Sequence, residues 1–363
     1  MTDLSQDEAF ARIRLLRSPN VGPVSYRQLL RRFGTAVAAL EALPDLAGRS
    51  GSYRVAPEAR VADEVAAVRR AGARYLFHDA PDYPALLGAM DGAPPILTYR
   101  GDLALAAKPS VAVVGARNAS AAAVKLARQF ASDLAEAGFV VVSGLARGID
   151  GAAHRAALGG GTIGVIASGI DVAYPPEHAE QQEDVASRGL LLAEQPVRTE
   201  PLARHFPSRN RIIAGLAAGT LVVEAAPKSG SLITARLAGE AGREVMAVPG
   251  SPLEPRSQGC NTLIREGAVL VQSAEDVIEL LSDFDGLPRS HVRESAAPFD
   301  GADYDSAGDP ADIAALLTLA PVAVDELIRQ SGASAPSVHM ALLELELSGR
   351  LVRHAAGRVS LAA

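Results

Sequence analysis

Between about residues 108 and 282, short apolar runs alternate with longer segments of helical periodicity, and this alternation constrains the fold more than any other feature of the chain. The apolar runs have the length and composition of buried strands. They are 111–115, 139–144, 162–168, 189–194, 220–224, 244–248 and 269–271. The helical segments between them include 120–138 and 148–158. Strands that alternate with helices are joined by right-handed crossovers, so the sequence predicts an α/β domain whose mostly parallel sheet has helices on both faces.

The ligand site of such a sheet is expected outside the carboxyl ends of its strands. Two loops at those ends predict anion sites, because each joins a strand to a helix and presents backbone N–H groups together with a basic side chain. The first loop consists of Gly115, Ala116 and Arg117. The second consists of Lys228, Ser229, Gly230 and Ser231. A third loop at the same edge, 144–150, contributes Arg147.

The stretch from residue 198 to 236 reverses the sign of the chain's charge locally. The whole chain has a formal net charge of −7. Within this stretch the acids are Glu200 and Glu224, and the basic residues are Arg198, Arg204, Arg209, Arg211, Lys228 and Arg236. A local basic cluster with hydroxyl and amide donors is suited to a row of phosphates.

Phe206 lies just before the triplet Arg209, Asn210 and Arg211. An aromatic side chain beside arginines is typical of single-strand recognition, which combines base stacking with phosphate pairing. Two plainer readings stay open from the residues alone: the triplet is a solvated helix start, and Phe206 belongs to the core.

The composition excludes several classes of protein. The length of 363 residues, with 48% hydrophobic and 21% charged residues, indicates a soluble protein of two or three domains. We find no secretory leader and no apolar run long enough to span a membrane, so we expect a cytoplasmic protein that does not associate with membranes. The single cysteine, Cys260, excludes an intramolecular disulfide and a cysteine-based zinc site, and we expect it to be buried. Metal-ligand clusters are absent from the sequence.

No cofactor-binding motif fits the two anion loops. Residues 115–117 lack the glycine spacing of a dinucleotide fingerprint, and Lys228 precedes its glycine rather than following it, unlike the lysine of a P-loop. We therefore expect no cofactor.

Catalytic constellations are equally lacking. Asp150 and His154 open a helix, where an aspartate most simply caps the first turn, and His205 has no partner that the sequence can place. The serines after the strands lack a nucleophile elbow. We expect no catalytic residue.

The regions on either side of the α/β centre predict separate modules. Residues 1–80 are expected to form a helical domain that resembles a SAM or helix-hairpin-helix unit, with a further helix over 54–80. Between positions 9 and 40 it has six arginines and no acid, which suits DNA binding and a protein-interaction role about equally. We place the α/β domain at 81–282 and an acidic flexible linker at 283–310. Residues 311–363 predict three helices and a hairpin, which make a winged helix. Its third helix carries Glu344 and Glu346, so groove reading is weakly supported and a protein contact or a supporting role fits at least equally well.

Six motifs of the α/β centre, taken in order, resemble the successive signatures of the DNA-processing protein A (DprA/Smf) family. They are Ala112–Arg117, Val142–His154, Gly169–Pro175, His205–Gly215, Lys228–Ala235 and Val248–Ser251. The terminal modules match a common domain layout of that family. The resemblance implies an extended Rossmann-like domain that binds single-stranded DNA, forms a homodimer, and loads the RecA recombinase during natural transformation and recombination.

By the same resemblance, Arg117 is the arginine that holds a phosphate and Phe206 lies near the bases. Arg209, Arg211 and Lys228 are expected to line the same pocket. The chain departs from the family pattern at two positions where relatives carry lysine, Pro176 and Ala203. Either Arg204 substitutes for the second lysine, or part of the electrostatic contact has moved elsewhere.

An enzyme on a related scaffold is the alternative. The centre also resembles nucleoside-monophosphate phosphoribohydrolases, whose phosphate loop is followed closely by a glutamate. Here the loop from Ser229 to Thr234 is followed by no glutamate before Glu240. A carboxylate that stabilises an oxocarbenium-like state is therefore missing. A pure interaction scaffold with an incidental basic crevice is the third hypothesis.

Overall fold

The computed structural model describes residues 4–46, 53–90, 92–282, 310–354 and 357–362. It divides into two compact units, and each is described by itself. Unit 1 contains Met1–Asp63 together with Glu294–Ala363, and unit 2 contains Glu64–Arg293.

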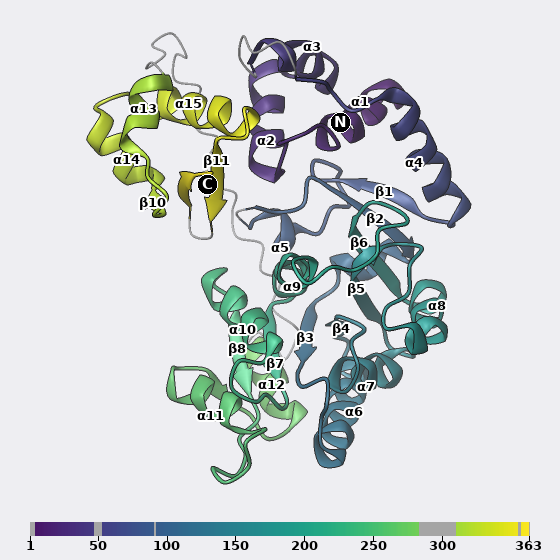
Figure 1. The fold of residues 1–363 in the computed structure, drawn as a ribbon. Coiled ribbons are helices and arrows are strands. Elements are labelled where there is room, and N and C mark those ends of the chain that lie inside the picture. The colour runs from purple at the N-terminus through teal and green to yellow at the C-terminus, as the bar shows by residue number, and fades with distance from the viewer. Residues whose placement is uncertain (1–3, 47–52, 91, 283–309, 355–356, 363) are drawn as a thin grey trace. The chain divides into compact units, whose positions relative to one another are not determined.

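A nine-stranded sheet forms the centre of the described part of unit 2, with the strand order β1-β2-β6-β5-β4-β3-β7-β8-β9 (Figure 1). The strands are β1 (Arg74–Phe77), β2 (Ile96–Gly101), β3 (Ser110–Val114), β4 (Val140–Ser143), β5 (Thr162–Gly169), β6 (Leu190–Gln195), β7 (Gly219–Val222), β8 (Glu244–Ala247) and β9 (Val269–Leu270). Every neighbouring pair from β6 to β9 is parallel, whereas β1 with β2 and β2 with β6 are antiparallel. The mostly parallel sheet predicted from the sequence is confirmed.

Helices cover both faces of this sheet because successive strand side chains point to opposite sides. On β3, Val111 and Val113 pack into one buried cluster with α6 and α7, while Ala112 and Val114 pack into another with α9 and α10. The elements that follow the strands in unit 2 are α5 (Ala85–Gly88), η1 (Leu103–Ala107), α6 (Ala121–Glu136), α7 (Ile149–Ala157), η2 (Pro176–His178), α8 (Ala179–Arg188), α9 (His205–Leu216), α10 (Gly230–Glu240), α11 (Gln258–Arg265) and α12 (Ala274–Leu281).

The chain reverses its direction of travel across the sheet at β3. From β3 it adds β4, β5 and β6 on one side, and it then returns to place β7, β8 and β9 on the other. Such a switch point opens a crevice outside the carboxyl ends of the strands on either side of it. The loops that follow β3 and β7, at 115–120 and 223–229, lie at that crevice.

The expectation of one helix over 54–80 is wrong in its last part. Helix α4 ends at Arg70 (Glu58–Arg70), and Arg74–Phe77 is the strand β1. Gly72, whose φ is 67°, turns the chain, and the strand then pairs with β2 from Phe77 opposite Ile96 to Arg74 opposite Tyr99. The tertiary partner decides the conformation of this four-residue segment.

Unit 1 contains the helices at the two ends of the chain. Its elements are α1 (Gln6–Leu16), α2 (Pro23–Phe33), α3 (Ala36–Leu46), α13 (Pro310–Leu316), β10 (Val322–Ala323), α14 (Val324–Ser331), α15 (Ala335–Leu347), β11 (Leu351–His354) and β12 (Arg358–Leu361). The three C-terminal helices and the β11–β12 hairpin agree with the prediction, and β10 is an additional short strand that pairs with β12. The predicted acidic linker lies largely outside the described residues.

Candidate nucleic-acid interface

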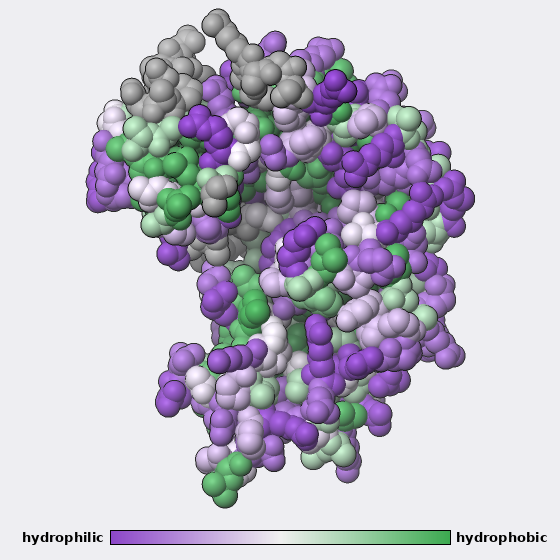
Figure 2. Space-filling view, in the orientation of Figure 1, coloured by the Kyte–Doolittle hydropathy of each residue, from purple (hydrophilic) through white to green (hydrophobic). Residues whose placement is uncertain are grey.

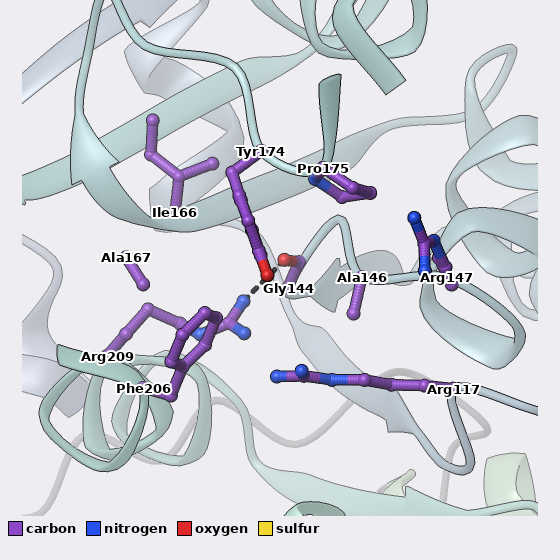
Figure 3. Close-up of a pocket in the computed structure, with 10 residues that line it drawn as sticks. All are labelled: Arg117, Gly144, Ala146, Arg147, Ile166, Ala167, Tyr174, Pro175, Phe206 and Arg209. Carbon is purple, nitrogen blue, oxygen red and sulfur yellow. Dashed lines mark hydrogen bonds between the residues drawn. The ribbon is translucent and has the colours of Figure 1, made fainter. Parts of the chain in front are cut away.

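A pocket opens at the carboxyl ends of β3, β4 and β5, next to the first turn of α9 (Figure 3). It is open to solvent. Its lining residues are Arg117, Gly144, Ala146, Arg147, Ile166, Ala167, Tyr174, Pro175, Phe206 and Arg209. The pocket therefore lies at the edge where the sequence predicts a ligand site, and it brings together Arg117 and Arg147 from two loops and Phe206 and Arg209 from the helix α9.

Aromatic rings and one exposed arginine stand together in this pocket. The Arg117 guanidinium carbon lies 4.8 Å from the centroid of the Phe206 ring, within cation–π distance. The Tyr174 and Phe206 ring centroids are 5.7 Å apart and their planes are tilted by 58°. Phe206 is only partly buried and Arg117 is exposed, so this arginine is accessible to solvent beside the ring. Phe206 is thus part of the pocket wall.

Arg209 lines the pocket but is a buried residue. One of its guanidinium nitrogens, Nη1, donates to the carbonyl oxygens of Gly144 at 2.5 Å and Val165 at 2.8 Å. Burial lowers the pKa of Arg209 to about 10, and the nearby Asp150 carboxylate raises it. The side chain remains a cation at neutral pH, yet its charge is opposed by a buried acid.

The sequence predicted that Asp150 caps the helix in which it lies, and this prediction is wrong. The N-cap residue of α7 is Gly148, and Asp150 is in the first turn of the helix. Its carboxylate accepts a hydrogen bond from the amide of Gly144 at 3.1 Å, so it holds the preceding loop. Burial raises the pKa of Asp150, and the charge of Arg209 lowers it. The structural reading of Asp150 is right, but its partner is different.

Two other basic residues of the predicted site are held in ion pairs. Arg147, at the pocket wall, pairs with Glu177, and both side chains are largely exposed. Arg211 pairs with Glu194, and both of these side chains are about four-fifths buried. Arg211 is not among the residues that line the pocket. Arg204 is the exposed N-cap residue of α9, so it stands at the start of the helix that carries Phe206.

The loop after β3 is held more tightly than an open anion loop. The amide of Ala116 donates to the carbonyl of Glu224 at 2.7 Å, and the amide of Ser120 donates to the Glu224 carboxylate at 2.8 Å. Gly115 has no room for a side chain, because a Cβ there would contact Ile149. The expected contribution of the Ala116 amide to an anion site is therefore wrong: this amide is already bonded, and Arg117 is the donor that the loop presents.

The second predicted anion loop lies at the carboxyl end of β7. Lys228 has a positive φ of 67° and is exposed. The Ser229 and Ser231 hydroxyls lie 2.8 Å apart and share a hydrogen bond. Gly230 begins α10, and its carbonyl accepts a hydrogen bond from Asn210 Nδ2 at 3.2 Å. The described residues give Lys228 no ion-pair partner, so its charge is available to a ligand.

Sequence reasoning missed the pocket residues contributed by β5 and the loop after it. They are Ile166, Ala167, Tyr174 and Pro175. Ile166 and Ala167 lie within the apolar run predicted as a strand, where nothing in the sequence separates core from pocket. Tyr174 lies within the motif Gly169–Pro175, and an aromatic residue in a loop that follows a predicted strand is the sequence signal that could have identified it. Its ring is exposed in the structure.

His154 and Cys260 have structural roles. His154 is fully buried, its Nδ1 lies 2.8 Å from the Thr162 hydroxyl, and burial lowers its pKa to about 3. Cys260 is buried, as predicted, and burial raises its pKa to about 11. The described residues contain no group of His, Cys, Asp and Glu side chains that could hold a metal ion. Within the same residues, no helix is both long and apolar enough to cross a membrane.

The fold and the pocket define a Rossmann-like protein with a helical module before the sheet and a winged helix after it. Residues 74–282 match the DNA recombination-mediator protein A family, residues 6–67 match the DprA-like N-terminal HHH domain, and residues 297–357 match the DprA winged helix domain. The chain belongs to the DNA recombination-mediator protein A family, as its motifs indicated.

Three known proteins illustrate the relationship. Protein Smf of Synechocystis is 41% identical over 221 residues, which are 59% of this chain and 55% of that protein. The crystal structure of DNA processing protein A from Streptococcus pneumoniae is 37% identical with a TM-score of 0.64, covering 76% of this chain and 98% of that one. A DNA processing protein A from Helicobacter pylori, solved for its single-stranded DNA binding mode, is 30% identical with a TM-score of 0.52, covering 57% of this chain and 95% of that one.

Proposed function

We propose that this protein binds single-stranded DNA in the pocket at the carboxyl ends of β3, β4 and β5. The observation that carries the proposal is the placement of Arg117 over the Phe206 ring, 4.8 Å from its centroid, beside Tyr174 at a solvent-open pocket. A guanidinium fork recognises phosphate oxygens, and adjacent aromatic faces accept unstacked bases. The similarity to a Helicobacter pylori protein with a single-stranded DNA binding mode supports the same ligand.

The electrostatic contact is concentrated in a few side chains. Arg117 and Lys228 are exposed, and the described residues give neither of them an ion pair, whereas Arg147, Arg209 and Arg211 all have internal partners. Because the chain as a whole is acidic, with a net charge of −7, binding depends on this local surface and not on bulk charge. Arg204, exposed at the start of α9, is in a place to extend the contact.

The protein acts on the strand without catalysing a reaction. Asp150 and His154, an acid and a base four residues apart in the sequence, are both buried and both bonded within the fold. The alternative of nucleotide glycosidic cleavage lacks its carboxylate: Glu224, at the end of β7, is bonded to the Ser120 amide and is buried. Incubation of the protein with nucleoside monophosphates is expected to release no free base.

Further roles are proposed from membership of the family. We propose that the protein works in the cytoplasm as a homodimer and loads the RecA recombinase onto incoming single strands during natural transformation. Membership of the DNA recombination-mediator protein A family supports this assignment.

Titration of a labelled oligothymidylate at several salt concentrations tests the proposed function. Affinity is expected to fall steeply with salt, because each phosphate contact releases counterions. Arg117→Gln and Lys228→Gln are each expected to weaken binding and to reduce the slope of log K against log[salt] by about 0.7. Arg236→Gln, which changes an exposed arginine that pairs with Glu240 on α10, serves as the control. Unchanged slopes in both test variants would refute the site.

A further inference from the structure

Arg209 and Asn210 are consecutive residues of α9 whose side chains are directed into the protein. Arg209 is 6% exposed and Asn210 is 8% exposed, whereas Arg117 and Lys228 are exposed. The sequence pattern places both in the DNA-binding set. The contacts that they make point to a different role.

Arg209 ties the loop after β4 to strand β5. Its Nη1 donates at once to the carbonyls of Gly144 and Val165, and the bond to Gly144 is drawn in Figure 3. The amide of the same glycine donates to Asp150, so both polar groups of Gly144 are fixed by two opposite charges. A Cβ on Gly144 would overlap the Arg209 guanidinium, which shows how closely the two groups pack. A phosphate could take this nitrogen only by leaving buried carbonyls unpaired, which is unfavourable.

Asn210 fastens the other loop. Its Nδ2 donates to the carbonyl of Gly230 at 3.2 Å, two residues after Lys228. Adjacent residues of a helix point in different directions, about 100° apart, so one helix reaches both loops from neighbouring positions. The loop that carries Arg147 is thus held by Arg209, and the loop that carries Lys228 is held by Asn210.

We propose that Arg209 and Asn210 are positioning residues, which fix the loop after β4 in the pocket wall and the loop that carries Lys228 relative to each other, and which do not themselves contact the DNA. The proposal rests on the proposed binding of single strands at this site. The exposed Arg117 and Lys228 contact the phosphates, and the buried pair keeps the loop of Lys228 in register with the pocket wall.

The Arg209 half is tested with the double variant Asp150→Asn/Arg209→Gln, which removes one buried acid and one buried base and so leaves the net charge of the pocket unchanged. Affinity for oligothymidylate is expected to fall by about tenfold, in the range of interactions within one hydrogen-bond network. The salt slope is expected to equal that of the wild type. Glu183→Gln/Arg100→Gln removes the ion pair between α8 and β2, neither of whose residues lines the pocket, and is the matched control, expected to keep wild-type affinity. A slope reduced as in Arg117→Gln, or an affinity equal to that of the wild type, overturns the proposal.

Arginine side-chain NMR of the wild-type protein tests whether Arg209 contacts DNA, and it needs no destabilising variant. On addition of DNA, the Arg117 guanidinium resonances are expected to shift. The Arg209 resonances are expected to keep their positions and their slow hydrogen exchange, because its partners do not change. A large shift at Arg209 would mean that it contacts DNA.

A double-mutant cycle tests the Asn210 half. If Asn210 acts through the loop of Lys228, Asn210→Ala weakens binding, and Asn210→Ala/Lys228→Ala binds no more weakly than Lys228→Ala alone. Additive losses, or no loss in Asn210→Ala, contradict the positioning role. A wild-type protein that fails to bind oligothymidylate at any salt concentration would instead refute the proposed function, so the two failures are distinguishable.

Discussion

At the residue scale, Phe206 is a partly buried ring beside the exposed Arg117, so its loss is expected to affect DNA binding and not folding. Phe206→Ala is expected to weaken single-strand binding by about 1–3 kcal/mol, since the ring supplies a face for base stacking. Its melting temperature is expected to change little, because the ring is only partly buried. Phe139→Ala, at a ring 1% exposed, is the control and is expected to lower stability by about 3–5 kcal/mol. A Phe206→Ala protein that melts like the control and binds normally when folded would contradict this assignment.

The buried His154 makes the stability of unit 2 depend on pH. Burial lowers the pKa of His154 to about 3, from about 6.5 when it is unfolded, so the unfolded state binds the extra proton between these values. The stability that this residue contributes is complete above pH 6.5 and is lost as the pH falls toward 3, by about 1.4 kcal/mol per pH unit. Urea unfolding of the wild type and of His154→Gln, measured between pH 7 and about 4.5, checks this. Parallel curves for the two proteins would rule out His154 as the source.

The sequence predicted which residues gather at the site better than what each of them does. Arg117 and Lys228 could be placed at the carboxyl ends of strands because glycine and small residues mark those ends in the sequence. Both residues are exposed there. Arg209 could not be recognised as a buried residue, since its partners, the carbonyls of Gly144 and Val165 and the carboxylate of Asp150, come from other loops and strands. A charge pattern along one segment carries no information about such partners.

At the scale of elements, periodicity identified the strands β3 to β9 but not the strand β1. The long runs of β3 to β6 are buried on both faces, so their apolar residues are continuous and distinct. The four residues of β1 are mostly not buried, and they pair with the antiparallel strand β2. Antiparallel pairing at that edge depends on where β2 lies, which no local pattern specifies.

The strand β9 ends the sheet with apolar residues at the surface. Val269 and Leu270 are 38% and 47% exposed, and β9 has only β8 as a described neighbour. Figure 2 also shows hydrophobic atoms at the surface of the lower tip of unit 2, beside α11. An uncovered edge strand offers its backbone and apolar side chains to another chain. We therefore expect the proposed homodimer to form here, with the same edge used by both copies.

Leu270→Lys is expected to convert this homodimer to a monomer, because a charge would be buried without a partner at the interface. Light scattering after size-exclusion chromatography measures the mass. Val37→Lys, which alters an apolar side chain of similar exposure in unit 1, is expected to remain dimeric. A dimeric Leu270→Lys protein would place the interface elsewhere.

At the scale of the whole molecule, a dimer offers two pockets to one strand, so its affinity is expected to depend on the length of the DNA. Binding at the second pocket becomes intramolecular once the strand spans both, and the resulting gain reaches about 10²–10⁴-fold without any new contact. The Leu270→Lys monomer is therefore expected to match the wild type on a strand too short to reach two pockets and to lose affinity on a long one. Titrations with an oligothymidylate length series measure this. Arg117→Gln, by contrast, is expected to weaken binding at every length, because it removes a contact from each pocket. Equal losses of the Leu270→Lys monomer on short and long strands would show that the interface shapes the pocket itself and does not simply join two of them.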